Sequence, residues 1–259
     1  PYSDEECVSI FTALVEQLKR LPSYDNDKLK ESYSKYILQS LAVVNTCVLP
    51  VILSQSDVKG ALDVVVHMFK TLISGIHQDC DEEILKLISM ILLNCLREFD
   101  ETMNQEILDI LLFPLLPSSR NQNSRVHELV SYIIRCAPVN FHLQISNFVN
   151  NVLIGSPLNA GSDCLSDLSE HIYPLIFELH KVSPDILLKV FPNICIQLHA
   201  EDDDIRLKAV KLLGRLFSST HGNYGIEFRK NFVEFIGRFV DKSSSIRLEM
   251  IDCGYLIIK

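Results

Sequence analysis

The sequence predicts an all-α fold in which about six antiparallel helix pairs stack into a right-handed solenoid. Apolar residues recur with the 3.6-residue period of a helix in almost every segment, and the strict alternation of a strand is almost absent. Most connections between these segments are short, which places consecutive helices antiparallel to one another. A two-helix pattern near the end of the chain also repeats after about 41 residues. These observations favour one repeat array over residues 1–259.

Six helices are predicted in the first half of the chain. Two of them have a start signal shaped like a capping box, Asp79-x-x-Glu82 and Thr102-x-x-Gln105, in which side chains bond backbone N–H groups at the helix start. The other four are placed by their apolar period. The predicted ranges are 4–20, 27–48, 57–77, 81–98, 103–116 and 122–136.

Six further helices are predicted in the second half. The helix at 184–199 has the clearest start, because Ser183 suits the cap and Pro184 needs no hydrogen bond in the first turn. Asp167-x-x-Glu170 is another box-like start, and the connection 154–163 contains the glycine and proline of a real loop. The predicted ranges are 139–153, 167–181, 184–199, 203–218, 225–240 and 244–258.

The repeat is clearest when residues 191–217 are moved forward by 41 positions. Apolar residues then meet apolar residues, such as Phe191 with Phe232 and Val210 with Ile251, and one Ile-Arg-Leu triplet meets another. A helix pair of about this length with an acidic turn before Ile-Arg is the pattern of HEAT repeats. A single hairpin cannot bury both of its apolar faces, so neighbouring hairpins must stack.

The composition argues against several functional classes. No apolar run reaches the roughly 18 residues of a membrane-spanning helix, and the acidic N-terminus does not resemble a secretory signal. We therefore expect a soluble domain without membrane attachment. The 24 Lys and Arg residues against 33 Asp and Glu give a net charge of −9. Because duplex DNA is bound through cations that displace phosphate counterions, we expect no strong direct DNA binding.

The sequence also lacks catalytic and metal-binding signatures. Its eight cysteines lie at least 15 residues apart, whereas zinc ligands usually come in pairs separated by about two to four residues. It contains no nucleophile elbow, phosphate-binding glycine loop or H-E-x-x-H motif. We therefore expect no catalytic residues, no cofactor and no metal, and interpret the cysteines as small buried side chains in a reducing compartment. The rival class is a catalytic domain whose acids or histidines assemble only in space.

Two arginines at equivalent repeat positions, Arg206 and Arg247, are candidates for contacts between repeats. In a stack of hairpins, the turn acid of one repeat can pair with the arginine of the next. We therefore expect Asp203 or Asp204 to meet Arg247.

Lys208, Lys211 and Arg215 form a basic stripe, because the spacing i, i+3 and i+7 places them on the polar face of one predicted helix. Such a stripe is usually a solvated face. A patch that binds a small anion or an acidic peptide is the alternative.

Five stretches, spread along the whole chain, match one known family in order and spacing. They are Pro1-Tyr2-Ser3-Asp4, Arg135-Cys-Ala-Pro138, Ser166-Asp-Leu-Ser-Glu-His171, Ala200 to Phe217 and Phe239 to Glu249. They resemble the cohesin regulator family called "precocious dissociation of sisters", fifth member. The resemblance implies that the chain is an N-terminal fragment of a longer, hook-shaped HEAT-repeat protein. It also implies a non-catalytic scaffold, nuclear and associated with chromatin, that regulates sister chromatid cohesion.

The same resemblance implies partners. Members of the family bind the kleisin subunit of cohesin and the releasing factor Wapl, and so control how long cohesin stays on chromosomes. Pro1-Tyr2 resembles the end of an Ala-Pro-rich motif that helps to form a docking site for short Wapl-type peptides. Asn45 stands where many relatives have a lysine. The predicted contacts are Tyr2 and Asn45, with helix 27–48 forming part of the wall of the site. Another HEAT scaffold, such as a nuclear transport receptor or a phosphatase scaffold, is the alternative function.

Overall fold

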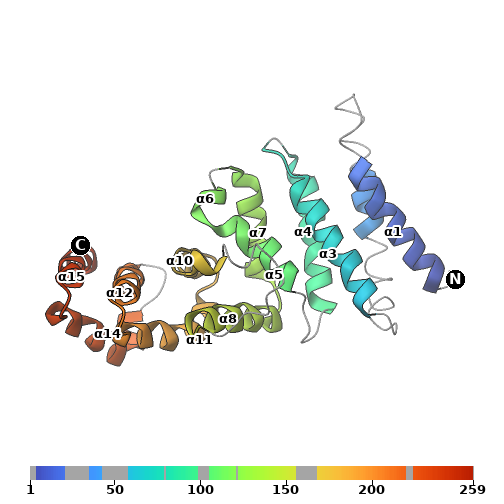
Figure 1. Ribbon diagram of the computed structural model, residues 1–259. Helices are drawn as coiled ribbons and strands as arrows, with labels where there is room; N and C mark the ends of the chain where they lie inside the picture. Colours follow the sequence, from blue (N-terminus) through green and yellow to red (C-terminus); the bar gives the residue numbers. More distant parts are fainter. Residues whose placement is uncertain are drawn as a thin grey trace. The chain divides into compact units, whose positions relative to one another are not determined.

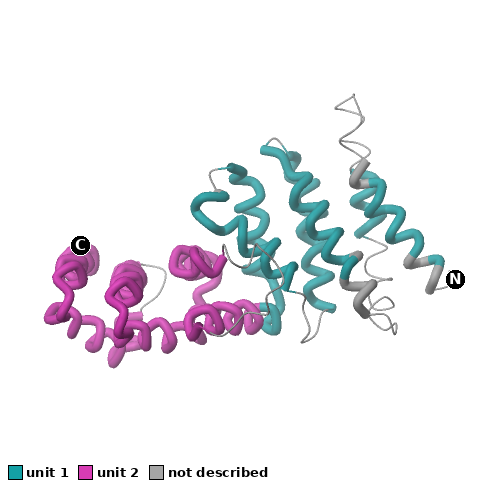
Figure 2. Tube along the Cα trace, in the orientation of Figure 1, with its two compact units in different colours: residues 1–141 teal, residues 142–259 magenta. Residues whose placement is uncertain are grey.

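The computed structural model describes residues 4–20, 35–42, 58–78, 80–98, 105–120, 122–155, 168–219 and 224–258. Regular structure in these ranges is helical throughout, without a strand. The chain divides into two compact units, residues 1–141 and 142–259 (Figures 1 and 2). The all-α prediction is confirmed, whereas a single segment over residues 1–259 stays a prediction.

The first unit consists of helical hairpins whose first and second helices lie in separate layers (Figure 1). Its helices are α1 (Asp4–Arg20), α3 (Val58–Ser74), α4 (Glu82–Glu98), α5 (Gln105–Leu112), η2 (Phe113–Leu115), α6 (Pro117–Arg120) and α7 (Ser124–Cys136). In one layer α3 contacts both α1 and α5, and in the other α4 contacts α7. Residues 35–42 are helical as well, inside the predicted helix 27–48. Stacking of successive hairpins therefore builds this unit, as a repeat array requires.

The second unit repeats the same arrangement. Its helices are α8 (Val139–Leu153), which begins at the end of the first unit, α10 (Ile172–Val182), α11 (Pro184–Ile196), η3 (Gln197–His199), α12 (Asp203–Phe217), α13 (Tyr224–Glu227), α14 (Arg229–Ile236), η4 (Gly237–Val240) and α15 (Ser244–Ile258). One layer contains α10, α12 and α15, with α12 in contact with both neighbours (Figure 1). The other contains α8, α11 and α14. Hydrogen bonds join its first two members, including Asn193 Nδ2 to Asn150 Oδ1 at 2.8 Å.

Several helices end or break where the periodicity predicted continuity. The predicted helix 225–240 is divided into α13, α14 and η4. The break between α13 and α14 falls at Phe228, which leaves helical geometry at φ −111° and ψ 46°. Its ring stacks on Phe191 with centroids 4.1 Å apart, so packing between helices overrides the local period. Pro114 lies in η2, which replaces the end of the predicted helix 103–116. A proline has no N–H to continue an α-helix.

The predicted helix starts have mixed outcomes. Helix α11 begins as predicted, with Ser183 at the N-cap position and Pro184 in the first turn, but the Ser183 side chain makes no capping hydrogen bond. Its backbone N–H instead donates to Leu179 O at 2.8 Å and ends α10. Asp202 caps α12 by accepting a hydrogen bond from the Asp204 N–H at 2.8 Å, which explains one acidic cluster. The box residues Asp79, Thr102 and Asp167 lie outside the described residues.

The core of the second unit is rich in aromatic rings. The ring of Phe191, which is fully buried, stacks on Tyr224 at 5.8 Å and meets Phe217 edge to face at 5.8 Å. Phe217 in turn packs on Phe235 at 5.2 Å. These rings come from four helices, and each buried aromatic removes a large apolar area from water. The cluster therefore holds the last two hairpins of this unit together.

The 41-residue repeat is also visible in the burial of equivalent positions. Val210 and Leu198 are fully buried, and α15 packs on α12, the helix that carries Val210. Their equivalents in that last hairpin, Ile251 and Phe239, are 60% and 39% exposed. Among the described residues, no further hairpin packs on the last one, so positions that are buried in the preceding repeat are exposed in this repeat.

The cysteines largely follow the prediction. Cys95, Cys195 and Cys253 are buried, and burial raises the pKa of Cys195 to about 12 and that of Cys253 to about 11. Both thiols therefore stay protonated and behave as small apolar groups. Cys136 is exposed, which corrects the interpretation of all cysteines as buried. Among the described helices, none combines the length and the hydropathy that crossing a membrane requires.

Candidate interaction sites in residues 142–259

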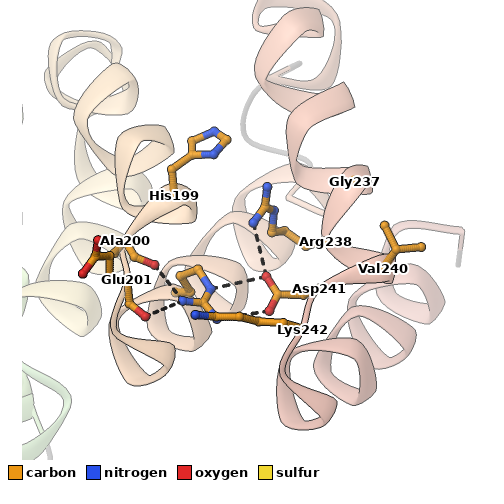
Figure 3. Close-up of a pocket in the computed structure, with 9 residues that line it drawn as sticks. His199, Ala200, Glu201, Gly237, Arg238, Val240, Asp241 and Lys242 are labelled. Atoms are coloured by element: carbon orange, nitrogen blue, oxygen red, sulfur yellow. Dashed lines mark hydrogen bonds and ion pairs between the residues drawn. The ribbon is translucent and has the colours of Figure 1, made fainter.

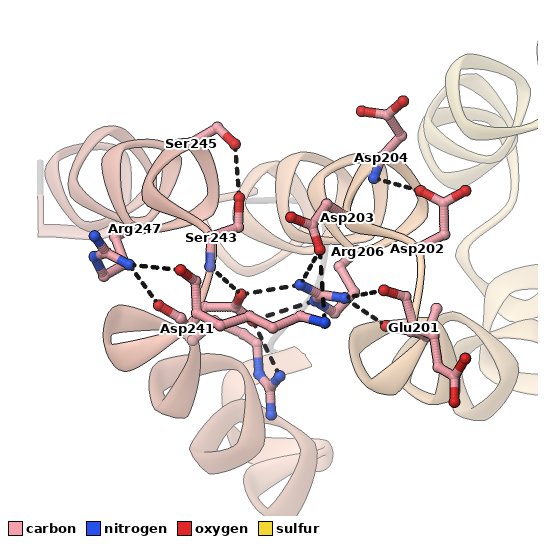
Figure 4. A network of polar contacts seen from close by, with 12 residues as sticks. Glu201, Asp202, Asp203, Asp204, Arg206, Asp241, Ser243, Ser245 and Arg247 are labelled. Carbon is pink, nitrogen blue, oxygen red and sulfur yellow. Dashed lines mark hydrogen bonds and ion pairs between the residues drawn. The ribbon is translucent and has the colours of Figure 1, made fainter.

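A buried ion pair joins the last two hairpins. Arg206 on α12 and Asp241, which follows η4, have side chains only 3% and 2% exposed. The guanidinium donates from Nη2 to Asp241 Oδ1 at 3.2 Å and from Nε to Oδ2 at 3.3 Å (Figure 4). The remaining donor, Nη1, binds the carbonyl oxygens of Ala200 and Glu201 at 2.7 and 2.8 Å. Arg206 thus links the turn before its own helix, at Ala200 and Glu201, to the equivalent turn of the next repeat, at Asp241.

The buried carboxylate of Asp241 accepts hydrogen bonds from Arg206, Arg238 and the Ser243 N–H. Burial alone raises the pKa of a carboxyl group. Here the effect of burial is outweighed by a hydrogen bond from the Ser243 N–H, by the charge and hydrogen bonds of Arg206, and by a further hydrogen bond from Arg238. The pKa of Asp241 therefore lies below its ordinary value of 3.8. The hydrogen bond to Asp241 likewise raises the pKa of Arg206, against the opposing effect of burial. Both groups are held in their charged forms.

The equivalent arginine one repeat later, Arg247, makes half of the same contacts. Its Nη1 donates to the carbonyl oxygens of Asp241 and Lys242 at 2.7 and 3.1 Å, six and five residues back, as Arg206 does in its own repeat. The predicted pair between Arg247 and Asp203 or Asp204 is wrong. Asp203 instead accepts from Arg206 at 2.5 Å, because each arginine turns back toward its own helix start. The link between repeats runs from an arginine forward to the acid of the next turn.

A pocket of about 370 Å³ opens beside this joint, lined by His199, Arg238, Val240 and Lys242 among others (Figure 3). Each of its basic side chains has a carboxylate nearby. Arg238 lies 3.2 Å from Asp241, Lys242 lies 3.9 Å from Asp203, and His199 lies 3.5 Å from Glu234. The basic side chains of the pocket thus have carboxylate partners within the chain, and we interpret the pocket as part of the joint between the repeats.

The predicted basic stripe lies along a second pocket, between α10 and α12. This groove has a volume of about 310 Å³ and is lined by Glu170, Tyr173 and Pro174 from the α10 side and by Leu212 with the stripe residues Lys208, Lys211 and Arg215 from α12. Leu212 is buried, and Tyr173 and Pro174 are half-buried. Burial also raises the pKa of Tyr173, so its phenol stays neutral. The structure thus brings the whole stripe to one groove, whose apolar lining sequence reasoning missed.

The other predicted site residues have different outcomes. Tyr2 and Asn45 lie outside the described residues. The part of the chain that the structure describes contains no group of three or more side chains that could hold a metal ion. His180 is buried, with Nδ1 2.9 Å from the Tyr224 hydroxyl and Nε2 2.8 Å from the Ser219 hydroxyl. His180 is therefore part of the packed core, where both ring nitrogens have hydrogen-bonding partners.

One protein family matches this chain over its whole length. The family model of the sister chromatid cohesion protein PDS5 matches residues 1–259. Sister chromatid cohesion protein PDS5 homolog A from Gallus gallus and from Homo sapiens are each 29% identical over 259 residues, with 97% of this chain and 18% of the relative covered. Homolog B from Gallus gallus is 28% identical over 255 residues. The chain thus spans about a fifth of the length of these relatives.

A solved structure has the same fold. A chain from the structure of the Pds5–Scc1 complex superposes with a TM-score of 0.75 at 17% sequence identity, covering all of this chain and 38% of that one. At this identity the likeness concerns the fold alone, and it confirms the predicted HEAT-repeat architecture. The family model carries the assignment, because it extends over all 259 residues. The chain therefore belongs to the PDS5 family of sister chromatid cohesion proteins.

Proposed function

We propose that this chain is part of a non-catalytic scaffold that regulates sister chromatid cohesion. The observation that carries the proposal is the match of the PDS5 family model to every residue from 1 to 259. Stacked helical hairpins suit a scaffold, because they offer long ridges and grooves to extended partners. The family match also favours cohesion over the alternatives of a transport receptor or a phosphatase scaffold.

The partners and the place of action form the finer part of the proposal. The scaffold binds the kleisin subunit of cohesin and the releasing factor Wapl, acts on chromatin in the nucleus and controls how long cohesin stays on chromosomes. Support comes from the names of the relatives, which are sister chromatid cohesion proteins, and from the solved Pds5–Scc1 complex.

Affinity capture of the full-length protein tests this function. We expect the tagged protein to retain the kleisin subunit and Wapl from nuclear extract, and its depletion to change the residence time of fluorescent cohesin on chromosomes measured by photobleaching. A tagged HEAT-repeat transport receptor is the matched control, because it shares the architecture but not the family. Capture of no cohesin subunit, together with an unchanged residence time, would contradict the proposal.

We further propose that a Wapl-type peptide docks beside Tyr2, with Asn45 on the wall of its site. In the full-length protein, Tyr2→Ala removes an aromatic contact and Asn45→Glu adds a charge, so each is expected to weaken binding by about tenfold, equivalent to about 1.4 kcal/mol. Isothermal titration with a synthetic Wapl-type peptide measures the effect. If both variants keep the helical circular dichroism of the wild type and bind equally tightly, the site lies elsewhere.

A further inference from the structure

The groove between α10 and α12 combines an apolar floor with a basic rim. The floor is made by the buried Leu212 and the half-buried Tyr173 and Pro174. Lys208, Lys211 and Arg215 are exposed and lie along the α12 side. The volume of about 310 Å³ is large enough for one or two side chains of a ligand, and too small for a folded partner to enter.

The rim carries positive charge that the chain itself does not fully balance. Glu170 is the one carboxylate in the lining, against three cations. Lys211 shares its charge with Glu249 at 3.6 Å. Arg215 stacks over the Phe177 ring at 3.5 Å, and among the described residues neither it nor Lys208 has an ion pair within 4.0 Å. In a chain with a net charge of −9, this groove is a local site of attraction for carboxylates.

The rim is also held in place. The stacking of Arg215 on Phe177 fixes the guanidinium against α10, and Lys181 approaches the same ring at 4.6 Å from its centroid. Lys211 is oriented by Glu249 from α15. Side chains that are ordered before binding lose less conformational entropy when a ligand arrives. Three successive helices of this layer therefore contribute to the geometry of one groove.

We propose that this groove binds a short acidic peptide segment of a partner protein. An apolar side chain of the peptide lies on Tyr173, Pro174 and Leu212, and flanking carboxylates meet Lys208 and Arg215. These two residues are seven positions apart on one helix, about 10.5 Å along its axis at about 1.5 Å per residue. An extended peptide of the polyproline type advances about 3.1 Å per residue, so its matching carboxylates lie three residues apart.

The same features disfavour a nucleic acid. Three cations with a carboxylate beside them neutralise few phosphates, and affinity for a duplex depends on the number neutralised. A largely apolar floor also offers nothing to a phosphate backbone. The proposal does not depend on cohesin, kleisin or Wapl, and it concerns residues far in the sequence from Tyr2 and Asn45.

Fluorescence anisotropy with the 259-residue chain tests the groove. The probe is a fluorescein-labelled dodecapeptide with Glu-Phe-Pro-Glu at its centre and Gly and Ser elsewhere. We expect saturable binding that weakens as salt is raised. The double variant Lys208→Glu/Arg215→Glu should lower the affinity by at least about tenfold, because two attractive contacts become repulsive. Replacing Phe with Ser in the probe should also lower it by about tenfold, because the apolar contact is lost.

Arg229→Glu/Lys230→Glu is the matched control, because both residues are exposed on α14 and the change in net charge is the same. It should bind the probe within about twofold of the wild type. Lys208→Glu alone leaves the Arg215 stacking intact, and Pro174→Glu places a carboxylate on the floor, so both remain informative if the double variant unfolds. The proposal is overturned if the two double variants bind equally, if the Ser probe binds as well as the Phe probe, or if labelled duplex DNA binds and the peptide does not.

Discussion

Arg206→Met is expected to destabilise the chain by about 3–5 kcal/mol, because it leaves the carboxylate of Asp241 buried without its main partner. That carboxylate is 2% exposed and accepts two hydrogen bonds from Arg206, which also anchors the carbonyl groups of Ala200 and Glu201. Unfolding in urea, followed by circular dichroism, measures the loss. Arg206→Met/Asp241→Leu should recover more than half of it, because well-packed apolar side chains often replace a buried ion pair without loss.

Arg247→Met is the matched control for this prediction. Arg247 makes the same two bonds to backbone carbonyl groups as Arg206 but is exposed. It should therefore cost only about 1 kcal/mol, the usual contribution of such hydrogen bonds. Equal losses for the two arginine variants would mean that the carbonyl contacts, and not the ion pair between repeats, stabilise the joint.

The ion pair of Arg206 and Asp241 also makes the stability of the chain depend on pH. Because the pKa of Asp241 is lowered in the folded chain, its contribution is present above the ordinary pKa of about 4 and is lost as the pH falls through the folded value. The difference in stability between the wild type and Arg206→Met should therefore shrink between about pH 5 and pH 3. A difference that stays constant over this range would show that the charge of Asp241 is not involved.

The helices were predictable because their apolar period directly reflects which face is buried. The register of the last two hairpins follows from the match of residues 191–217 to positions 41 residues later, and the structure buries Ile194 and Phe235 alike. What the period does not encode is a local break that tertiary contacts select. Phe228 ends one helical turn and begins another because its ring stacks on Phe191, a residue from a different hairpin. No neighbouring residue signals that break.

The sites were less predictable than the fold, because each depends on which side chains meet across helices. The stripe Lys208, Lys211 and Arg215 was visible as one helix face, but Tyr173 opposite it comes from α10 and has no signal of its own. Asp241 was missed for a similar reason. The three consecutive acids at 202–204 are conspicuous in the sequence, whereas Asp241 is an isolated acid. Its equivalent in the preceding repeat is Ala200, so the 41-residue repeat does not indicate that an acid at this position pairs with Arg206.

Gly214→Ala is expected to destabilise the chain by about 2–3 kcal/mol, although alanine is the better helix former by about 1 kcal/mol. Gly214 lies where α12 packs on α15, and a Cβ added there would lie 2.8 Å from the Cβ of Cys253 and closer still to its sulfur. Both atoms belong to a buried residue, and Cys253 also approaches the Val210 carbonyl at 3.8 Å. The two helices must therefore separate along much of their contact to admit one methyl group.

Two further variants isolate this close approach. Gly237→Ala adds a methyl group at a helical position with no atom within 4 Å, so it should be neutral or stabilise by about 0.4–1 kcal/mol. Combined with Gly214→Ala, Cys253→Gly removes both the sulfur and the Cβ that collide, whereas Cys253→Ala leaves the Cβ at 2.8 Å. In a double-mutant cycle followed by urea unfolding, Cys253→Gly should therefore offset more of the stability lost in Gly214→Ala than Cys253→Ala does. Equal coupling for the two, or a harmless Gly214→Ala, would show that α12 and α15 are not packed as closely as this contact requires.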